Sequence, residues 1–267
     1  MTKKPAEIIF TDLDGTLLDH ATYSYERALP GLDLVRALRI PLVMVSSKTF
    51  PEMAALHAEL SLHSPFIFEN GGGIAWVEPS GDEEFSVEIL GIPFEEIRAA
   101  VPAVEEALGF AITPIGDLDD GELAARTGLT PERVRLAKMR RASMPFIVPD
   151  AAARIDLESA SARVARLGLV VTRGGRFYHL IGKGADKGEA VRRVIGYYLR
   201  TWGWDSLESG GIGDSENDVP LLRAVTMPVL VRRHDGSYID CGFEVIKTAE
   251  AGPAGFSEAV TLLCGEE

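Results

Sequence analysis

The sequence predicts an α/β fold, a Rossmann-like parallel sheet that forms a core domain, with an α+β cap domain inserted into it. Short segments that are apolar throughout alternate with segments of helical spacing at both ends of the chain, which is typical of parallel strands buried on both faces. Between residues 85 and 181 the pattern changes to short strands, helices and a hairpin. We therefore expect a discontinuous core at 1–84 and 182–267, and a cap at 85–181.

The first core segment contains three predicted strands. AEIIFTD, IPLVMVSS and PFIFENGGG are apolar runs that end in polar or glycine residues. The stretch ERALPGLDLVRALR, between the first two, has leucine and valine at helical spacing, and FPEMAALHAELSL carries a proline near its first turn. Both therefore predict helices.

The inserted segment predicts a mixed module. FSVEILG, FAITPIG and PFIVP are expected as strands, PFEEIRAAVPAVEEALG as one helix, and ARIDLESASARVARLG as another, with two further helical stretches between them. LVVT and RFYHLIG, joined by glycines, predict a hairpin. After it, GADKGEAVRRVIGYYLRTWG predicts a helix, SGGIGDSENDVPLL a strand, a loop and a helix start, and MPVLVRR another strand.

Composition excludes several classes of function. The 267 residues carry a net charge of −13, whereas nucleic-acid binding needs clustered lysine and arginine. No apolar run reaches the roughly 18 residues of a membrane span, and the N-terminus has no signal core. From the charge and the apolar runs we expect no nucleic-acid or membrane partners. The presence of only two cysteines predicts a cytoplasmic protein. The oligomeric state is left open.

Carboxylates follow the predicted strands. Asp12 and Asp14 end the first strand in DLDGT, and Asp214 follows a later one in GDSEND. Ligands of open α/β sheets bind beyond the carboxyl ends of the strands, and hard oxygen ligands suit Mg²⁺. We therefore expect a magnesium site formed by Asp12, Asp14 and Asp214, with Asp12 as nucleophile and Asp14 for proton transfer.

Four polar residues are suited to binding a phosphoryl group. Ser46 and Ser47 follow a predicted strand, Lys187 lies near the start of a predicted helix, and Asn217 lies close to Asp214 in the sequence. Ser47 is equally consistent with a helix cap. Asp218 either ligates the metal or orients Asn217 or Lys187. The histidines lack a zinc-like spacing, and His179, in the predicted hairpin, is the one singled out for testing.

Taken in order, DLDGTLLD, the serine after the second strand, the lysine of DKG, and GDSEND resemble the four motifs of the haloacid dehalogenase superfamily of phosphohydrolases. The large insert resembles the subclass with an α/β cap. VSSKTFPEM, PFIFENGGG, RRASMPF and TRGGRFYHLIG resemble the mannosyl-3-phosphoglycerate phosphatases within it. The resemblance implies a Mg²⁺-dependent phosphatase that passes through an aspartyl-phosphate, with the carbonyl of Asp14 on the metal.

It further implies a small phosphorylated sugar-glycerate as substrate, mannosyl-3-phosphoglycerate or its glucosyl analogue, in the synthesis of a compatible solute. The expected contacts to the remainder of that substrate are Glu69, Asn70, Gly71, Arg140, Arg141, Ser143, Gly174, Gly175 and Arg176. A phosphatase for another small metabolite and a phosphosugar mutase remain alternatives. A non-catalytic binding protein fits the Asp12/Asp14 pair poorly.

Overall fold

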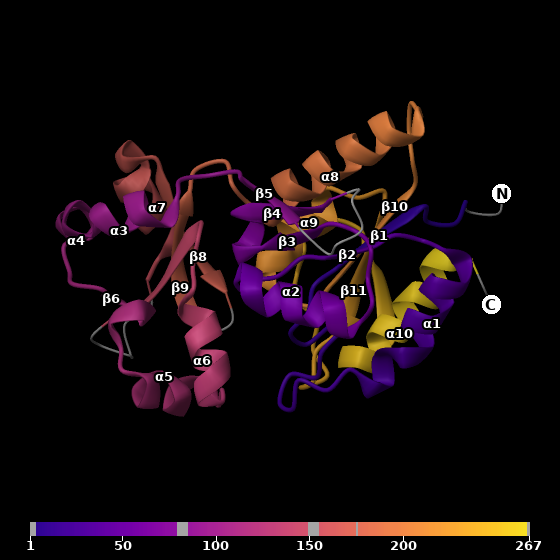
Figure 1. Cartoon of the computed structure of the whole chain (residues 1–267), viewed down its shortest axis with the longest axis horizontal. Helices are drawn as coiled ribbons and strands as arrows, with labels where there is room; N and C mark the ends of the chain where they lie inside the picture. Colours follow the sequence, from indigo (N-terminus) through magenta and orange to yellow (C-terminus); the bar gives the residue numbers. More distant parts are fainter. Residues whose placement is uncertain (1–3, 79–84, 149–154, 175, 266–267) are drawn as a thin grey trace. The chain divides into compact units, whose positions relative to one another are not determined.

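The structure is a computed structural model that describes residues 4–78, 85–148, 155–174 and 176–265 (Figure 1). It divides into two compact units. Unit 1 comprises residues 1–46, 62–67 and 187–267, and unit 2 comprises residues 47–61 and 68–186. The predicted domain boundaries, of which residue 84 lies outside the described residues, stay a prediction.

Unit 1 is built on a five-stranded sheet with the order β12-β11-β10-β1-β2. Its strands are β1 (Ile8–Thr11), β2 (Leu42–Met44), β10 (Ser209–Gly213), β11 (Met227–Arg232) and β12 (Ile246–Ala251). All the neighbouring pairs are parallel. Parallel pairing brings every carboxyl end to one edge of the sheet, so residues far apart in sequence meet there.

Helices cover both faces of this sheet (Figure 1). They are α1 (Leu29–Leu38), α8 (Lys187–Trp202), α9 (Val219–Arg223) and α10 (Gly252–Cys264). The glycines of β10 allow their close approach. A Cβ at Gly210 would lie 2.6 Å from Leu263 Cδ1 of α10, and one at Gly211 would lie 2.9 Å from Leu221 Cδ2 of α9. Because successive strand residues face opposite sides, α10 and α9 pack on opposite faces.

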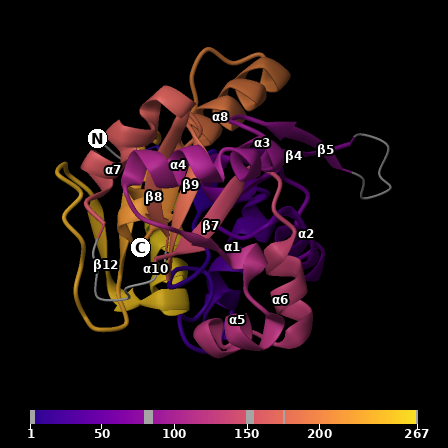
Figure 2. The same cartoon turned by 90° about the vertical axis from the view of Figure 1, so that its left-hand side faces the viewer.

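Unit 2 contains a four-stranded antiparallel sheet with the order β6-β7-β9-β8. Its strands are β6 (Thr113–Pro114), β7 (Ser143–Ile147), β8 (Leu169–Gly174) and β9 (Phe177–Gly182). One face packs on α3 (Phe94–Ala99), α4 (Val101–Leu108) and α7 (Leu157–Val164), which lie in front of the sheet in Figure 2. The core of this layer includes Ile97, Val104, Phe146, Val164 and Leu180.

The remaining elements of unit 2 are α2 (Phe50–Glu59), α5 (Asp120–Thr127) and α6 (Pro131–Lys138). A three-stranded sheet has the order β3-β4-β5. Its strands are β3 (Phe66–Phe68), of which Phe66 and Ile67 belong to unit 1, β4 (Gly73–Val77) and β5 (Phe85–Ile89). Short 3₁₀ turns lie at 26–28, 69–71, 115–117, 165–167 and 216–218. None of the helices that the structure describes is long and apolar enough to cross a lipid bilayer.

Two sequence expectations need correction. The helix predicted over 93–109 is divided at Ala100 into α3 and α4, because Pro102 sits in the first turn of α4, where its missing N–H is tolerated. The strand predicted over FAITPIG contracts to Thr113–Pro114, since Ile115 begins a 3₁₀ turn. The hairpin prediction is confirmed by the pairing of β8 with β9.

The tight packing of β10 gives a test of unit 1. Gly210→Ala is expected to lower the free energy of unfolding by about 1–3 kcal/mol, because the added methyl group overpacks against Leu263. Gly196→Ala in α8 is the matched control, since its Cβ would meet nothing closer than 3.4 Å and alanine favours a helix by about 0.5–1 kcal/mol. Urea denaturation measures both. Equal stability of the two variants would contradict this account of the packing.

Candidate active site

The carboxyl edge of the unit 1 sheet gathers the predicted catalytic motifs. Asp12 follows β1 and donates its backbone N–H to the carbonyl of Ile212 in β10 at 2.9 Å. Asp214 follows β10 directly. Ser46 follows β2 and is buried, and its N–H is bonded to the Ile67 carbonyl at 3.0 Å. These three positions come from neighbouring strands of the order β10-β1-β2.

Three buried carboxylates form a cluster at this edge. One oxygen each of Asp12, Asp214 and Asp218 lie within 4.8 Å of one another. Burial, followed by the negative charge of Asp218, raises the pKa of Asp12 to about 7. Burial, followed by the negative charge of Asp218, also raises the pKa of Asp214 to about 8. The cluster is therefore short of positive charge, which favours binding of a cation.

Lys187 supplies one positive charge inside the cluster. Its Nζ donates to Asp12 Oδ1 at 2.6 Å and to Asp218 Oδ1 at 2.7 Å, and its side chain is only 1% exposed. Burial alone lowers the pKa of this amine, but Asp12 and Asp218 outweigh it and hold that pKa above its ordinary value. The amine is therefore cationic, and one oxygen of Asp12 is paired with it.

Asp218 is held in place by the backbone of its own loop. Its Oδ2 accepts hydrogen bonds from the N–H groups of Asp214 (3.1 Å) and Ser215 (3.0 Å) and from Ser215 Oγ (2.9 Å). With Lys187 on Oδ1, both its oxygens are engaged. These contacts favour the orienting role over metal ligation. Asn217 belongs to the same loop, where its Oδ1 accepts from Ser215 Oγ.

Asp14 lies in a turn beyond the end of β1. The chain leaves strand geometry after Thr11, so alternation along a strand does not place the side chains of Asp12 and Asp14 on one face. Asp14 is partly exposed, and its carboxylate is not part of the three-carboxylate cluster found among the described residues. Gly15 has a φ of +90°, and a Cβ there would lie 2.7 Å from Asp214 Oδ2. Glycine thus lets this turn pass close to Asp214.

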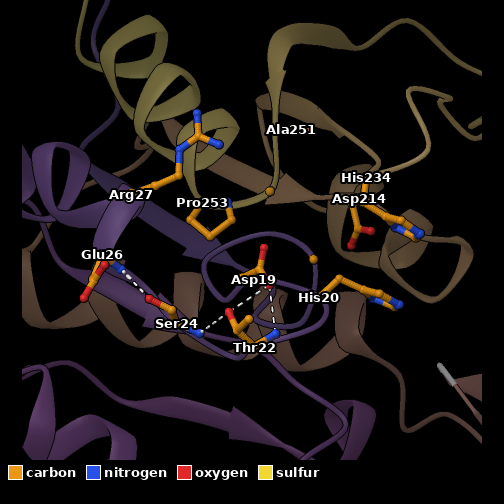
Figure 3. A pocket seen from close by; sticks show the side chains of 12 residues that line it. Asp19, His20, Thr22, Ser24, Glu26, Arg27, Asp214, His234, Ala251 and Pro253 are labelled. Atoms are coloured by element: carbon orange, nitrogen blue, oxygen red, sulfur yellow. Dashed lines mark hydrogen bonds between the residues drawn. The ribbon is translucent and has the colours of Figure 1, made fainter.

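A cavity of about 620 Å³ within unit 1 reaches Asp214 (Figure 3). Gly15 and Asp214 line it together with six residues between positions 19 and 27, His234, the last residue of β12 and the first two residues of α10. The rings of His20 and His234 stack in parallel, with their centroids 4.5 Å apart. Sequence reasoning missed this cavity because most of its lining comes from scattered residues outside the DLDGTLLD and GDSEND motifs. It leaves room for solvent beside Asp214.

The substrate-contact candidates of unit 2 centre on Glu69. Its carboxylate is fully buried and accepts from the N–H groups of Arg141 (2.8 Å) and Ala142 (3.1 Å) and from Ser143 Oγ (2.7 Å). Glu69, Asn70 and Gly71 all have positive φ, between 52° and 91°. Such a run of left-handed residues is strained, and the buried carboxylate contacts hold it in place.

The three candidate arginines are fixed within unit 2. Arg140 donates through Nε to the Ala137 carbonyl at 2.9 Å and through Nη1 to the Ser47 carbonyl at 2.7 Å. The Arg141 guanidinium lies 4.3 Å from the ring centre of Phe50, and Arg176 donates to the Thr127 carbonyl. Gly174 ends β8. Gly175 lies outside the described residues, and the assigned roles of all these residues stay predictions.

No model of a protein family matches the sequence. Solved structures give a match in fold: a phosphatase of the haloalkanoate (HAD) superfamily from Bacteroides thetaiotaomicron is similar over 98% of this chain and 96% of its own, with a TM-score of 0.66 and 18% identity. This confirms the predicted fold class, a parallel-sheet α/β core with an additional antiparallel cap.

Two named relatives match almost the whole chain. Both are called glucosyl-3-phosphoglycerate/mannosyl-3-phosphoglycerate phosphatase. The one from Persephonella marina is 37% identical and the one from Methanococcoides burtonii 38% identical, each over 97% of both chains. Identity at this level over 97% of both chains indicates a closer relationship than a shared fold alone. The chain therefore belongs to the glucosyl-3-phosphoglycerate/mannosyl-3-phosphoglycerate phosphatase family of haloacid dehalogenase-fold phosphatases.

Proposed function

We propose that this protein hydrolyses glucosyl-3-phosphoglycerate and mannosyl-3-phosphoglycerate to the glycosylglycerate and phosphate, through an aspartyl-phosphate on Asp12. The observation that carries this proposal is the buried cluster of Asp12, Asp214 and Asp218 around Lys187. Purely structural clusters rarely keep three carboxylates and one amine out of water, because the desolvation cost is high. Family membership supports the choice of substrate.

The cluster fits a divalent cation. Asp12 and Asp214 offer carboxylate oxygens, and the negative excess that raises their pKa values is what a cation would offset. Oxygen ligands of this kind suit Mg²⁺. Asp12, Asp214 and the carbonyl of Asp14 would hold it. When bound, the cation would offset the negative charge of the phosphate and reduce the repulsion between the carboxylates.

Asp12 is the nucleophile. One of its oxygens forms a bond to phosphorus, and the bond from phosphorus to the glycerate oxygen breaks, with its electrons leaving on that oxygen. Burial and the charge of Asp218 raise the pKa of Asp12, and the ion pair with Lys187 opposes that rise and holds the attacking carboxylate in a fixed orientation. Water then attacks the phosphorus of the aspartyl-phosphate and regenerates the Asp12 carboxylate.

Asp14 moves the protons. It gives one to the departing glycerate oxygen and later accepts one from the water that attacks the intermediate. Its position is suited to this work, because it is partly exposed whereas Asp12 is buried. The two carboxylates, two residues apart, thus have different surroundings and different roles.

Ser46, Ser47, Lys187 and Asn217 bind the phosphoryl oxygens in this proposal. The amine of Lys187 lies at the cluster already, and its charge stabilises the transferring group as negative charge is redistributed. The non-phosphate end of the substrate is assigned to unit 2, through Glu69, Asn70, Gly71, Arg140, Arg141, Ser143, Gly174, Gly175 and Arg176. The charged donors among them suit a carboxylate.

Phosphate release over a panel of substrates tests the proposed function. With Mg²⁺, we expect the two glycosyl-3-phosphoglycerates to have the highest kcat/KM, well above those of hexose phosphates and 3-phosphoglycerate. Excess chelator should remove the activity and added Mg²⁺ should restore it, because the carboxylates need a cation. A preference for another phosphate ester would overturn the substrate assignment. Full activity in chelator would overturn the metal assignment, and isomerised sugar phosphate without free phosphate would indicate a mutase.

Asp14→Asn tests the proton-transfer role. The amide cannot donate a proton as the carboxylic acid does, so steady-state turnover should fall by about 10²–10⁴-fold. An activated aryl phosphate needs no protonation of its leaving group, so its rate of phosphoenzyme formation should be largely restored while the hydrolysis step stays slow. Single-turnover kinetics separate the two steps. If both substrates lose the same factor in the first step, Asp14 is not the acid.

A further inference from the structure

Unit 2 contains a buried histidine that the proposed function leaves unused. His179 lies in β9, where it is paired with Pro145 of β7 and Thr172 of β8. Its side chain is only 3% exposed, and its Nδ1 has no hydrogen-bond partner in the part of the chain that the structure describes. Burying a polar atom without a partner is costly. Such an atom in a native protein therefore indicates a missing ligand or water.

The space beside this ring is kept open by Gly174. A Cβ at Gly174 would lie 3.0 Å from His179 Nε2 and 3.4 Å from Asn70 Nδ2. Gly174 is not among the glycines with positive φ, so its backbone conformation does not require glycine. A glycine inside a strand often marks a place where another group approaches closely. A larger residue at this position would fill the space before Nε2 of His179 and Nδ2 of Asn70.

The surroundings of His179 favour an anion. Burial, followed by the positive charge of Arg140, lowers the pKa of the imidazole to about 3. The ring is therefore neutral beside a fixed guanidinium. The Glu69 carboxylate accepts its hydrogen bonds from Arg141 N–H, Ala142 N–H and Ser143 Oγ, while the Arg140 guanidinium donates to backbone carbonyls.

The position of Asn70 is also fixed. The same contacts of Glu69 hold the left-handed segment that carries it, in which Asn70 has a φ of 59°. The amide Nδ2 of Asn70 thus faces the space beside Gly174 from a rigid and strained turn. A neutral imidazole, an amide and a guanidinium together offer more hydrogen-bond donors than acceptors. A carboxylate, which accepts through two oxygens, matches such a set.

We propose that His179, together with Asn70 and Arg140, binds the carboxylate of the glycerate group and so makes the enzyme specific for glycosylglycerate esters. This inference rests on the proposed function for the identity of the ligand, but not for the existence of the site. His179 acts as a specificity-determining residue and takes no part in phosphoryl transfer.

A pair of matched ligands tests the carboxylate directly. Glucosylglycerate and glucosylglycerol differ only in that a hydroxymethyl group replaces the carboxylate. The wild-type protein should bind the former at least tenfold more tightly, as measured by isothermal titration calorimetry, and His179→Leu should remove this preference. Rescue of the preference by His179→Gln, which restores a polar atom near the place of Nε2, the ring nitrogen that faces Gly174, is expected. Equal affinities in the wild-type protein, or an unchanged preference in His179→Leu, would overturn the proposal.

Kinetics provide an independent readout with a control. His179→Leu and Gly174→Ala should each raise KM for glucosyl-3-phosphoglycerate about 10- to 100-fold, the factor expected from losing a hydrogen bond to a charged group. The kcat, and the KM for p-nitrophenyl phosphate, should change less than twofold. His57→Leu is the control, because His57 is buried against Phe85 in the same unit and should leave both KM values unchanged. Parallel losses for both substrates would assign His179 a structural role only.

The two experiments separate failure of this inference from failure of the proposed function. Suppose that the wild-type protein binds glucosylglycerate, that His179→Leu loses this binding, and that the phosphate ester is not hydrolysed. This result would support the site and contradict the reaction. Hydrolysis of the ester with an unchanged KM in both His179→Leu and Gly174→Ala would support the reaction and contradict the site.

Discussion

The buried amine of Lys187 is the interaction on which the arrangement of unit 1 depends. It joins Asp12, at the end of β1, to Asp218, in the loop after β10, with distances of 2.6 and 2.7 Å. Removing one partner of a buried ion pair is strongly unfavourable, because the remaining charges lose their compensation. The amine thus determines which oxygen of Asp12 is paired and leaves the other for chemistry. Asp218 extends the same network to the backbone of Asp214 and Ser215.

Unit 2 uses a buried carboxylate for a comparable purpose. The carboxylate of Glu69 accepts hydrogen bonds from two backbone N–H groups and from a hydroxyl. This arrangement keeps Asn70 in a left-handed conformation beside Gly174 and His179. In both units, then, a charged side chain taken out of water fixes the neighbours that bind substrate in our proposal. Three hydrogen bonds to the Glu69 carboxylate and two from the Lys187 amine offset part of the cost of desolvation.

Much of the fold and of the cluster could be predicted from the sequence. Apolar strands followed by Asp12, Ser46 and Asp214 are local patterns, and parallel topology brings strand ends together whatever the distance in sequence. The assignment of Glu69 to substrate contact shows the limit. Its pattern, a polar residue after a strand, looks the same whether its side chain faces a ligand or anchors Arg141 and Ser143. Local sequence also cannot report that Nδ1 of His179 lacks a partner, since that depends on three strands of a sheet.

The central claim is that Asp12, held by Lys187, carries the phosphoryl group. It is tested most directly by rapid acid quench of the wild-type enzyme with glucosyl-3-phosphoglycerate, followed by reduction of the acyl-phosphate with borohydride and peptide mass spectrometry. The account predicts that the aspartate at position 12 is converted to homoserine, in proportion to a burst of glycosylglycerate. Labelling of Asp14, or turnover without labelling of any aspartate, would contradict it.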